Sequence, residues 1–342
     1  MTQSNPQGSA GTTQRESRFL ITGAKGFIGV WIVKNLVERG DRPWIFDLDH
    51  KSHRLDMLLR RDQLDRVGLI PGDIRRVEDV DRAVAEHGIT NIIHLAALQV
   101  PACAQNPPLG AEVNVGGTLN VFEVAKRRRD TVRHIVYASS AAVFGPEEFY
   151  GGAAVKEGAQ LRPGTHYGVF KECNEGNARV YYAQDGISSS GLRPWAVYGA
   201  GRDQGLTSAP TKAIKAIVVA RPYAIHFTGA FDLQYVNDTA RIFIRCSEAG
   251  LEGARVYSLR GSVVDMEDFL ATLQKLHPAA LQLIRAEGNR LPIAPDLDDS
   301  ALVRDLGDLP RTSLEAGIGE TLRIFQQLQA ENRLDTADLE TP

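Results

Sequence analysis

Short apolar runs alternate with longer amphipathic segments along residues 18–193. The apolar runs have the length of buried strands, and the segments between them carry apolar residues at helical spacing. Strands are predicted at 18–21, 43–47, 67–70, 91–95, 134–139 and 187–193, and helices at 27–38, 51–62, 77–87, 109–129 and 166–184. Such alternation is typical of βαβ units, so we predict an α/β protein with a doubly wound parallel sheet.

The pattern loosens after Pro194, where glycine and proline become frequent. We interpret residues 17–194 as a sheet domain and residues 195–329 mainly as a smaller C-terminal lobe, some segments of which return to the first domain. Ligands of open α/β sheets bind outside the carboxyl ends of the strands, so the lobe is expected to supply the substrate side of a site. Residues 1–16 are interpreted as a disordered tail and residues 330–342 as an acidic C-terminal tail.

The composition argues against several classes of function. The 342 residues include 42 acidic and 39 basic ones, a balance that gives no electrostatic surface for nucleic acid or an anionic membrane. Three cysteines lie far apart without a CxxC pair, which argues against disulfides and for a reducing compartment. The chain contains neither an apolar run near the ~18 residues of a membrane span nor the apolar stretch of a secretory signal, so a cytoplasmic protein is expected.

A glycine-rich segment, TGAKGFIG at 22–29, connects the first strand to the first helix. Glycines permit a tight turn, close approach of a pyrophosphate to the backbone, and close packing of the helix on the strand. The helix N-terminus adds N–H groups and the positive end of its dipole. Because the segment lies between a strand and an amphipathic helix, it predicts a dinucleotide site. A structural turn without a ligand is the alternative.

Two acidic residues extend this interpretation. Asp47 ends the second strand, near the ~20-residue spacing after the turn that suits an acid binding a ribose 2′-hydroxyl. A carboxylate there repels a 2′-phosphate, and no Arg or Lys follows before Lys51, which favours NAD over NADP. A helix cap is the alternative role of Asp47. Asp73, after the third strand, is a candidate partner of the adenine amino group or an ordinary turn residue.

Tyr167 and Lys171 lie four residues apart on a predicted helix, so their side chains share one face. A tyrosine ionises near pH ~10, and a neighbouring ammonium is expected to lower that pKa enough for proton transfer. Ser140 follows the fifth strand, where its hydroxyl would face the predicted crevice and hold a substrate oxygen. Such a spacing also arises by chance, so the pair alone is not diagnostic.

Other chemistries find less support in the sequence. His50 and His53 have a spacing that metal ligands use, but no third ligand follows nearby, and no metal site is expected. The G-x-S-x-G elbow of serine hydrolases does not occur. We interpret His94, at a strand end, as a packed core residue rather than a base.

Seven segments carry a family resemblance: TGAKGFIG at 22–29, GDI at 72–74, HLAA at 94–97, YASSAAVFG at 137–145, YGVFK at 167–171, LRPWAVYGAG at 192–201 and LQYVNDTA at 233–240. In this order they resemble the extended short-chain dehydrogenases/reductases of the NAD-dependent epimerase/dehydratase family, over Phe19 to Phe325. The resemblance implies a Rossmann-type domain that binds NAD and a second lobe that binds a small-molecule substrate.

The resemblance also implies roles for individual residues. Ser140, Tyr167 and Lys171 match the catalytic triad, in which the tyrosine removes a hydroxyl proton while hydride passes to NAD. Asn114 would support the site from its helix. The cofactor-binding positions are Gly23, Gly26, Phe27, Ile28, Gly29, Asp47, Asp73, Ile74, Leu95, Ala96, Ala97, Tyr167, Lys171 and Pro194. Members commonly pair through the helices here at 109–129 and 166–184, so a homodimer is expected.

Two departures from the family's pattern narrow the reaction. Dehydratases place an Asp-Glu pair after the catalytic hydroxyl, where this chain has Ala141 and Ala142, so dehydration is disfavoured. Nucleotide-sugar members often hold the diphosphate with an arginine where this chain has Phe231. The remaining candidate cations of the second lobe are Arg202, Lys212, Lys215, Arg221 and Arg290. The segment 202–208 is either a lining of the substrate pocket or a plain surface loop.

We therefore expect hydride transfer at a secondary alcohol or ketone of a small sugar, sugar acid or related compound. One alternative is a UDP-sugar 4-epimerase that keeps NAD bound and shows no net redox change. The other is a non-catalytic NAD(H)-binding protein. Such proteins usually lose the tyrosine or the lysine, and this chain has both.

Overall fold

The computed structural model describes residues 17–48 and 52–340. Its centre is a seven-stranded sheet with the strand order β10-β6-β5-β4-β1-β2-β3, in which every neighbouring pair is parallel. The strands are β1 (Phe19–Thr22), β2 (Trp44–Asp47), β3 (Gly68–Pro71), β4 (Asn91–His94), β5 (His134–Ala138), β6 (Ser189–Arg193) and β10 (Ala254–Ser258). From β1 the chain adds β2 and β3 on one side of the sheet, and from β4 it adds β5 and β6 on the other side. The strand order therefore reverses between β1 and β4, where a crevice opens. The predicted doubly wound Rossmann-type fold is confirmed.

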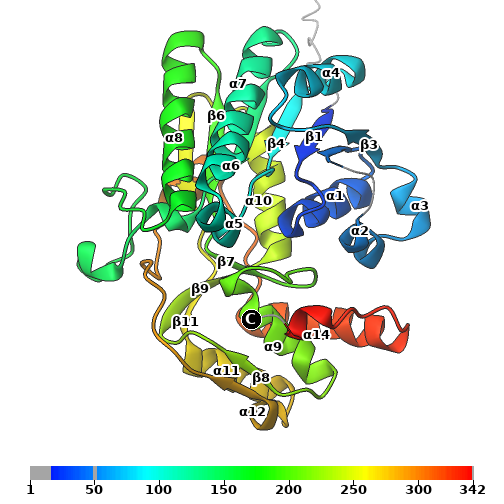
Figure 1. The fold of residues 1–342 in the computed structure, drawn as a ribbon, viewed down its shortest axis with the longest axis vertical. Coiled ribbons are helices and arrows are strands. Elements are labelled where there is room, and N and C mark those ends of the chain that lie inside the picture. Colours follow the sequence, from blue (N-terminus) through cyan, green and yellow to red (C-terminus); the bar gives the residue numbers. More distant parts are fainter. Residues whose placement is uncertain (1–16, 49–51, 341–342) are drawn as a thin grey trace, which may run out of the picture.

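Helices cover both faces of this sheet (Figure 1). Alternate residues of β1 point to opposite sides. Phe19 and Ile21 join the apolar cluster that includes α1 (Phe27–Arg39), whereas Leu20 joins the cluster that includes α4 (Val77–His87) and α7 (Gly117–Arg127). The helices on the first face are α1 and α10 (Val236–Glu248), and those on the second are α4, α7 and α8 (His166–Asp185). The sheet is therefore buried on both sides.

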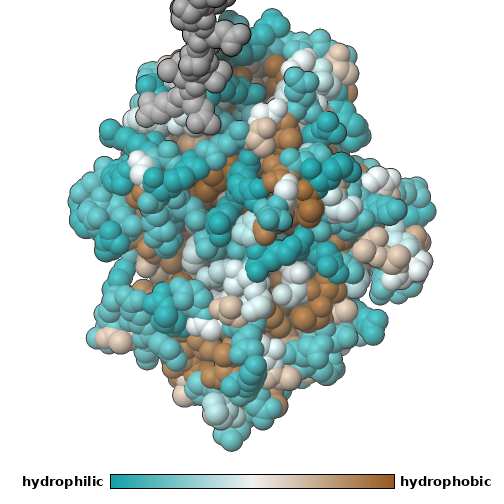
Figure 2. Space-filling view, turned by 180° about the vertical axis from the view of Figure 1, so that it is seen from behind, coloured by the Kyte–Doolittle hydropathy of each residue, from teal (hydrophilic) through white to brown (hydrophobic). Residues whose placement is uncertain are grey.

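A smaller lobe lies beyond the carboxyl ends of the strands (Figure 1). It contains a three-stranded sheet of β7 (Ala196–Tyr198), β9 (Ala230–Tyr235) and β11 (Ser262–Asp265), and a strand pair of β8 (Tyr223–Ile225) and β12 (Ile284–Ala286). Its helices are α9 (Ala209–Val218), α11 (Met266–Leu276), α12 (Ala280–Leu283) and α14 (Leu314–Ala330). Residues 236–258, which form α10 and β10, return to the large sheet, and α13 (Ser300–Leu306) packs against β10. Seen from behind, the apolar surface of the molecule is divided into separate areas by polar residues (Figure 2).

Two predicted helices are interrupted. The helix expected at 51–62 consists of α2 (His53–Leu58) and α3 (Arg61–Leu64), because Leu59 is extended and Arg60 starts a new cap with Gln63. The helix expected at 109–129 begins with α6 (Pro107–Ala111), continues as a π-turn at Glu112–Gly116 and ends as α7. A short helix, α5 (Val100–Gln105), precedes it.

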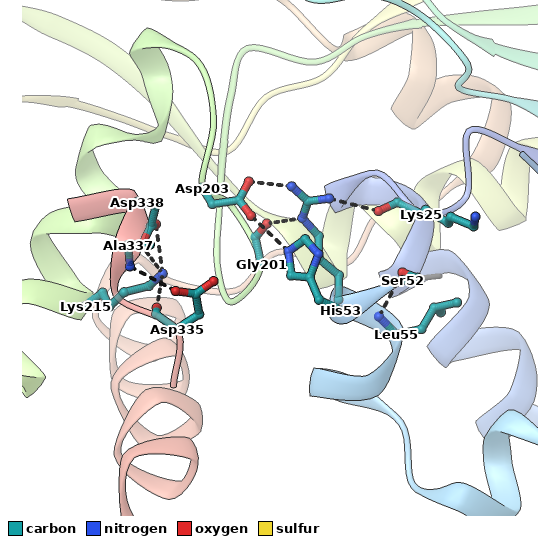
Figure 3. A network of polar contacts seen from close by, with 11 residues as sticks. Lys25, Ser52, His53, Leu55, Gly201, Asp203, Lys215, Asp335, Ala337 and Asp338 are labelled. Atoms are coloured by element: carbon teal, nitrogen blue, oxygen red, sulfur yellow. Dashed lines mark hydrogen bonds and ion pairs between the residues drawn. The ribbon is translucent and has the colours of Figure 1, made fainter. Parts of the chain in front are cut away.

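The C-terminal segment is described up to residue 340, whereas residues 1–16, interpreted above as a tail, lie outside the described residues. His50 also lies outside them. The acidic residues after Ala330, which were interpreted as a tail, include a 3₁₀ turn at Ala337–Glu340. This segment lies against α9, because the Lys215 ammonium donates to Asp338 at 2.7 Å and to the Asp335 carbonyl at 3.0 Å (Figure 3). Among the described helices, none combines the length and apolar character needed to cross a membrane.

Candidate active site

A cavity of about 210 Å³ lies at the carboxyl ends of β1, β4, β5 and β6. It brings together most of the residues that the sequence predicted: Gly23, Gly26, Phe27, Ile28, Gly29, Leu95, Ala97, Ser140, Tyr167, Lys171 and Pro194. Lining residues that were not assigned from the sequence include Gln99, Val100 and Ile293. No periodic pattern or motif marks these three. Trp195 also lines the cavity; it lies in the segment LRPWAVYGAG, but no role was assigned to it from the sequence.

The glycine-rich turn packs directly against the end of β4. Gly23 has a φ of +66°, and a Cβ at this position would lie 2.6 Å from the Cα atom of Ala96. Only glycine fits both the conformation and the approach. Helix α1 then begins at Phe27 without a side-chain cap, and its first residues, Phe27, Ile28 and Gly29, line the cavity. This arrangement fits the pyrophosphate of a dinucleotide.

Four predicted cofactor residues lie outside the cavity lining. Asp47 ends β2, where its Oδ2 accepts a hydrogen bond from the Lys25 N–H at 3.3 Å. Asp73 forms an ion pair with Arg75 at 2.5 Å, and Ile74 is buried against Gly117. The backbone of Ala96 packs against Gly23 of the glycine-rich turn. The roles of Asp47 and Asp73 at the adenosine end therefore stay predictions.

Helix α8 carries Tyr167 and Lys171 and approaches the segment after β5 very closely. A Cβ on Gly168 would lie 2.3 Å from the Ala142 carbonyl, so the glycine permits this contact. Lys171 is buried, and its Nζ donates to the Ala138 carbonyl at 2.6 Å and lies 5.4 Å from the centroid of the Tyr167 ring. Tyr167 in turn is hydrogen-bonded to Ser140. The three residues predicted to be catalytic thus lie side by side.

The electrostatics of this group differ from the expectation. Burial raises the pKa of Tyr167, although the Ser140 hydrogen bond and the Arg202 guanidinium partly oppose it. The expected net lowering of the Tyr167 pKa by Lys171 is therefore wrong for the protein alone. Burial also lowers the pKa of Lys171 to about 8, with Cys103 and Glu175 opposing the change. A helical spacing reveals that two groups are close, but not how far they are removed from water.

A buried ion pair fixes the three segments that carry these residues. Glu175 is fully buried one turn after Lys171, and both its oxygens accept from Arg193, at 2.8 and 2.7 Å. Glu175 also accepts from the Ser139 hydroxyl at 2.5 Å. Ser139 precedes Ser140, and Arg193 precedes Pro194. Glu175 was not assigned from the sequence, although its spacing of four residues from Lys171 was a usable signal.

Of the five candidate cations in the second lobe, Arg202 alone lines the cavity. Lys215 is paired with Asp338, and Lys212 is buried on the same helix. Arg221 is exposed near Glu340, and Arg290 packs against Gly229. Phe231 is fully buried between Phe227 and Phe269, so it is a core residue of the lobe. The loop at 202–208 contributes Arg202 and Thr207 to the cavity, which makes it part of the lining.

Parallel strands and a glycine-rich turn that faces a cavity are typical of a Rossmann-type dinucleotide-binding protein. The sequence profile described as the NAD dependent epimerase/dehydratase family matches residues 19–259, and the chain belongs to this family. It is therefore an enzyme with NAD as its cofactor. Across the described residues, no group of three His, Cys, Asp or Glu side chains could hold a metal ion.

Individual relatives cover most of the chain. UDP-glucuronate 4-epimerase 4 of Arabidopsis thaliana is 29% identical over 331 residues, which span 90% of this chain and 74% of that protein. The crystal structure of UDP-glucose 4-epimerase from Thermus thermophilus in complex with NAD is 25% identical, covers 90% of this chain and 99% of its own, and has a TM-score of 0.76. A partial consensus L-threonine 3-dehydrogenase has a TM-score of 0.80 at 22% identity, covering 91% and 99% of the two chains. The last similarity shows a shared fold.

His94 ends β4 beneath the cavity and is confirmed as a packed core residue. It is 4% exposed, with Nδ1 at 2.7 Å from the Thr22 hydroxyl and Nε2 at 3.0 Å from the Thr118 hydroxyl. Burial, assisted by the Lys171 ammonium, lowers the pKa of His94 to about 3. The imidazole is therefore neutral over the physiological range.

This burial predicts a specific acid sensitivity. The folded pKa of His94 lies below the unfolded value of ~6.5, so the unfolded chain gains the proton first and stability falls as the pH drops from about 6.5 towards 3. Between pH 7 and pH 5, His94 should account for about 2 kcal/mol of lost unfolding free energy. Urea unfolding at both pH values should show a loss smaller by that amount in His94→Gln. Equal losses in wild type and His94→Gln would contradict a neutral buried His94.

Proposed function

We propose that this protein is an NAD-dependent oxidoreductase that interconverts a secondary alcohol and a ketone in a small hydroxy acid, such as a sugar acid. The observation that carries the proposal is Arg202, which lines the same cavity as Tyr167 and Ser140. Its Nη2 donates to the Thr207 hydroxyl at 3.0 Å, while its buried Nε has no hydrogen-bond partner among the described residues. A guanidinium that lines a cavity next to the reacting group suits a carboxylate.

In the proposed reaction each residue of the cavity has a defined task. Ser140 holds the substrate oxygen, and Tyr167 takes the hydroxyl proton during oxidation or returns it during reduction. NAD, when bound, accepts or supplies the hydride. The Lys171 ammonium lies against the face of the Tyr167 ring, and its positive charge favours the phenolate that oxidation requires. Arg202 fixes the far end of the substrate, so that the reacting carbon stays near Tyr167.

A 4-epimerase acting on a nucleotide sugar is the second candidate, and the names of the relatives favour it. Such an enzyme oxidises and re-reduces one carbon without net redox change. A diphosphate needs cations, but Phe231 is uncharged and buried, and Lys212, Lys215, Arg221 and Arg290 do not line the cavity. One arginine suits a single carboxylate better than a nucleoside diphosphate. The distribution of charge therefore supports the smaller acid.

The proposed role of Tyr167 predicts a large loss of rate on removal of one hydroxyl group. Tyr167→Phe should lower kcat/KM about 10²- to 10⁴-fold, the range typical of a lost general acid–base group. NADH absorbance measures the rate with the best hydroxy acid as substrate. The NAD dissociation constant should change less than about threefold, and Tyr182→Phe, at an exposed tyrosine of the same helix, serves as the control. An active Tyr167→Phe enzyme would disprove the assignment.

The role of Arg202 predicts a loss that depends on the substrate's charge. Arg202→Met should raise KM for the hydroxy acid about 10- to 100-fold, because a charge-assisted hydrogen bond contributes about 1.5–3 kcal/mol. The uncharged amide of the same acid should lose much less. Arg221→Met, which removes an exposed cation of the same lobe, should leave both substrates unaffected. Steady-state kinetics that show equal losses for acid and amide would argue against a carboxylate at Arg202.

We further propose that the protein forms a homodimer through α7 and α8. These helices lie side by side on one face of the sheet (Figure 1), and Val169 and Val180 of α8 are exposed. Light scattering after size exclusion is expected to give twice the chain mass of 37.4 kDa. Val180→Glu should shift the protein towards the monomer, since a buried like-charge pair would form across a two-fold axis. A monomeric wild type would refute this proposal.

A further inference from the structure

Arg54, on α2, makes hydrogen bonds to two distant segments at once. Its Nη1 donates to the Lys25 carbonyl in the glycine-rich turn at 3.1 Å. Its Nε donates to the Gly201 carbonyl at 3.0 Å, and its Nη2 to Asp203 Oδ1 at 2.5 Å (Figure 3). Gly201 and Asp203 flank Arg202 in the loop after β7. One guanidinium therefore connects the turn predicted to hold the cofactor to the loop that carries Arg202.

This contact is more enclosed than an ordinary surface ion pair. The Arg54 and Asp203 side chains are 14% and 19% exposed, whereas those of the nearby pair Arg60 and Asp62 are 72% and 70% exposed. His53 Nε2 lies 3.3 Å from Asp203 Oδ2, so both carboxylate oxygens have a partner on α2. Burial raises the pKa of Asp203, but the contacts with Arg54 and His53 more than offset it, and the net pKa lies below the ordinary value. The carboxylate is charged at neutral pH.

The same two segments also pack closely against each other. A Cβ on Gly201 would lie 3.2 Å from Met57 Cε and 3.5 Å from the ring of Phe27. Phe27 is the first residue of α1 and lines the cavity, and the Arg202 guanidinium lies 5.8 Å from its ring centroid. The loop therefore packs against the first residue of α1, which follows the turn, and Arg54 bridges the loop and the turn through hydrogen bonds. Displacement of one segment changes the contacts of the other.

We propose that Arg54 and Asp203 form a clasp that holds Arg202 in the cavity and couples it to the glycine-rich turn, so that a pyrophosphate on the turn stabilises the substrate loop. Neither residue lines the cavity, so both are positioning residues. The inference rests on the proposed function, because it assigns Arg202 to the substrate. It goes beyond that function by making substrate affinity depend on occupancy of the turn.

Amide hydrogen exchange of the full chain tests the clasp without any substrate. The probe is ADP-ribose, which has the pyrophosphate but lacks the nicotinamide, and the readout is exchange in peptides covering 199–208. In the wild type, ADP-ribose should slow exchange there at least about threefold. In Arg54→Met, exchange without ligand should be at least about threefold faster than in wild type, and saturating ADP-ribose should no longer slow it. Asp203→Asn should show the same faster exchange and the same lack of response to ADP-ribose. It replaces Arg54→Met in the test if that variant does not fold.

The matched control is Arg128→Met, which removes an arginine paired through two hydrogen bonds with Asp81, away from the cavity. It should exchange like the wild type at 199–208. The clasp is overturned if exchange at 199–208 is unchanged in Arg54→Met, or if ADP-ribose slows it equally in Arg54→Met and wild type. Once a substrate is known, Arg54→Met should raise its KM about tenfold with kcat within about threefold. Failure of the hydroxy-acid proposal would appear separately, as an absence of turnover in an enzyme whose exchange still responds to ADP-ribose.

Discussion

The geometry of the catalytic group depends on the buried ion pair between Glu175 and Arg193. Three segments distant in sequence meet at this pair: α8 with Tyr167 and Lys171, the end of β5 with Ser140, and the end of β6 with Pro194. The desolvation penalty of two buried charges largely cancels their attraction, so the pair adds little net stability. Its main effect is to fix the three segments relative to one another. Loss of one partner, however, would leave an unpaired buried charge at a cost of about 3–5 kcal/mol. Misalignment of the segments is therefore strongly disfavoured.

The sequence predicted the parts of the molecule that follow from local rules. The pattern located the six strands of the first domain within a few residues, because strands covered on both faces are mostly apolar, although β6 has the sequence SSGLR and β3 alternates between buried and exposed residues. The glycine-rich turn and the Tyr167/Lys171 spacing were visible for the same reason, since each needs particular residue types at fixed separations. The interruptions at Leu59 and Gly116 were not visible, because they depend on capping and packing rather than on periodicity.

Features that depend on contacts between distant segments could not be predicted from the sequence. The sequence offered the loop at 202–208 equally as a pocket lining or a surface loop, and it ranked Arg202 with Arg221 and Arg290; only the fold shows that Arg202 alone of these three lines the cavity. The pKa of Tyr167 moves upward because the surrounding segments exclude water, an effect that the spacing of two residues does not contain. The fold defines the cofactor and the chemistry of the catalytic group, whereas the second lobe determines the substrate through the placement of a few side chains.

Our central claim is that one arginine-bound carboxylate, rather than a nucleoside diphosphate, orients the substrate for net hydride transfer. The most direct test is NADH absorbance of the purified wild-type enzyme with added NAD and a panel of sugar acids, other small hydroxy acids, neutral sugars and UDP-sugars. We predict a sustained rise with at least one hydroxy acid and none with UDP-sugars. Constant absorbance with every acid, together with isomerisation of a UDP-sugar in the product mixture, would contradict the claim and establish an epimerase.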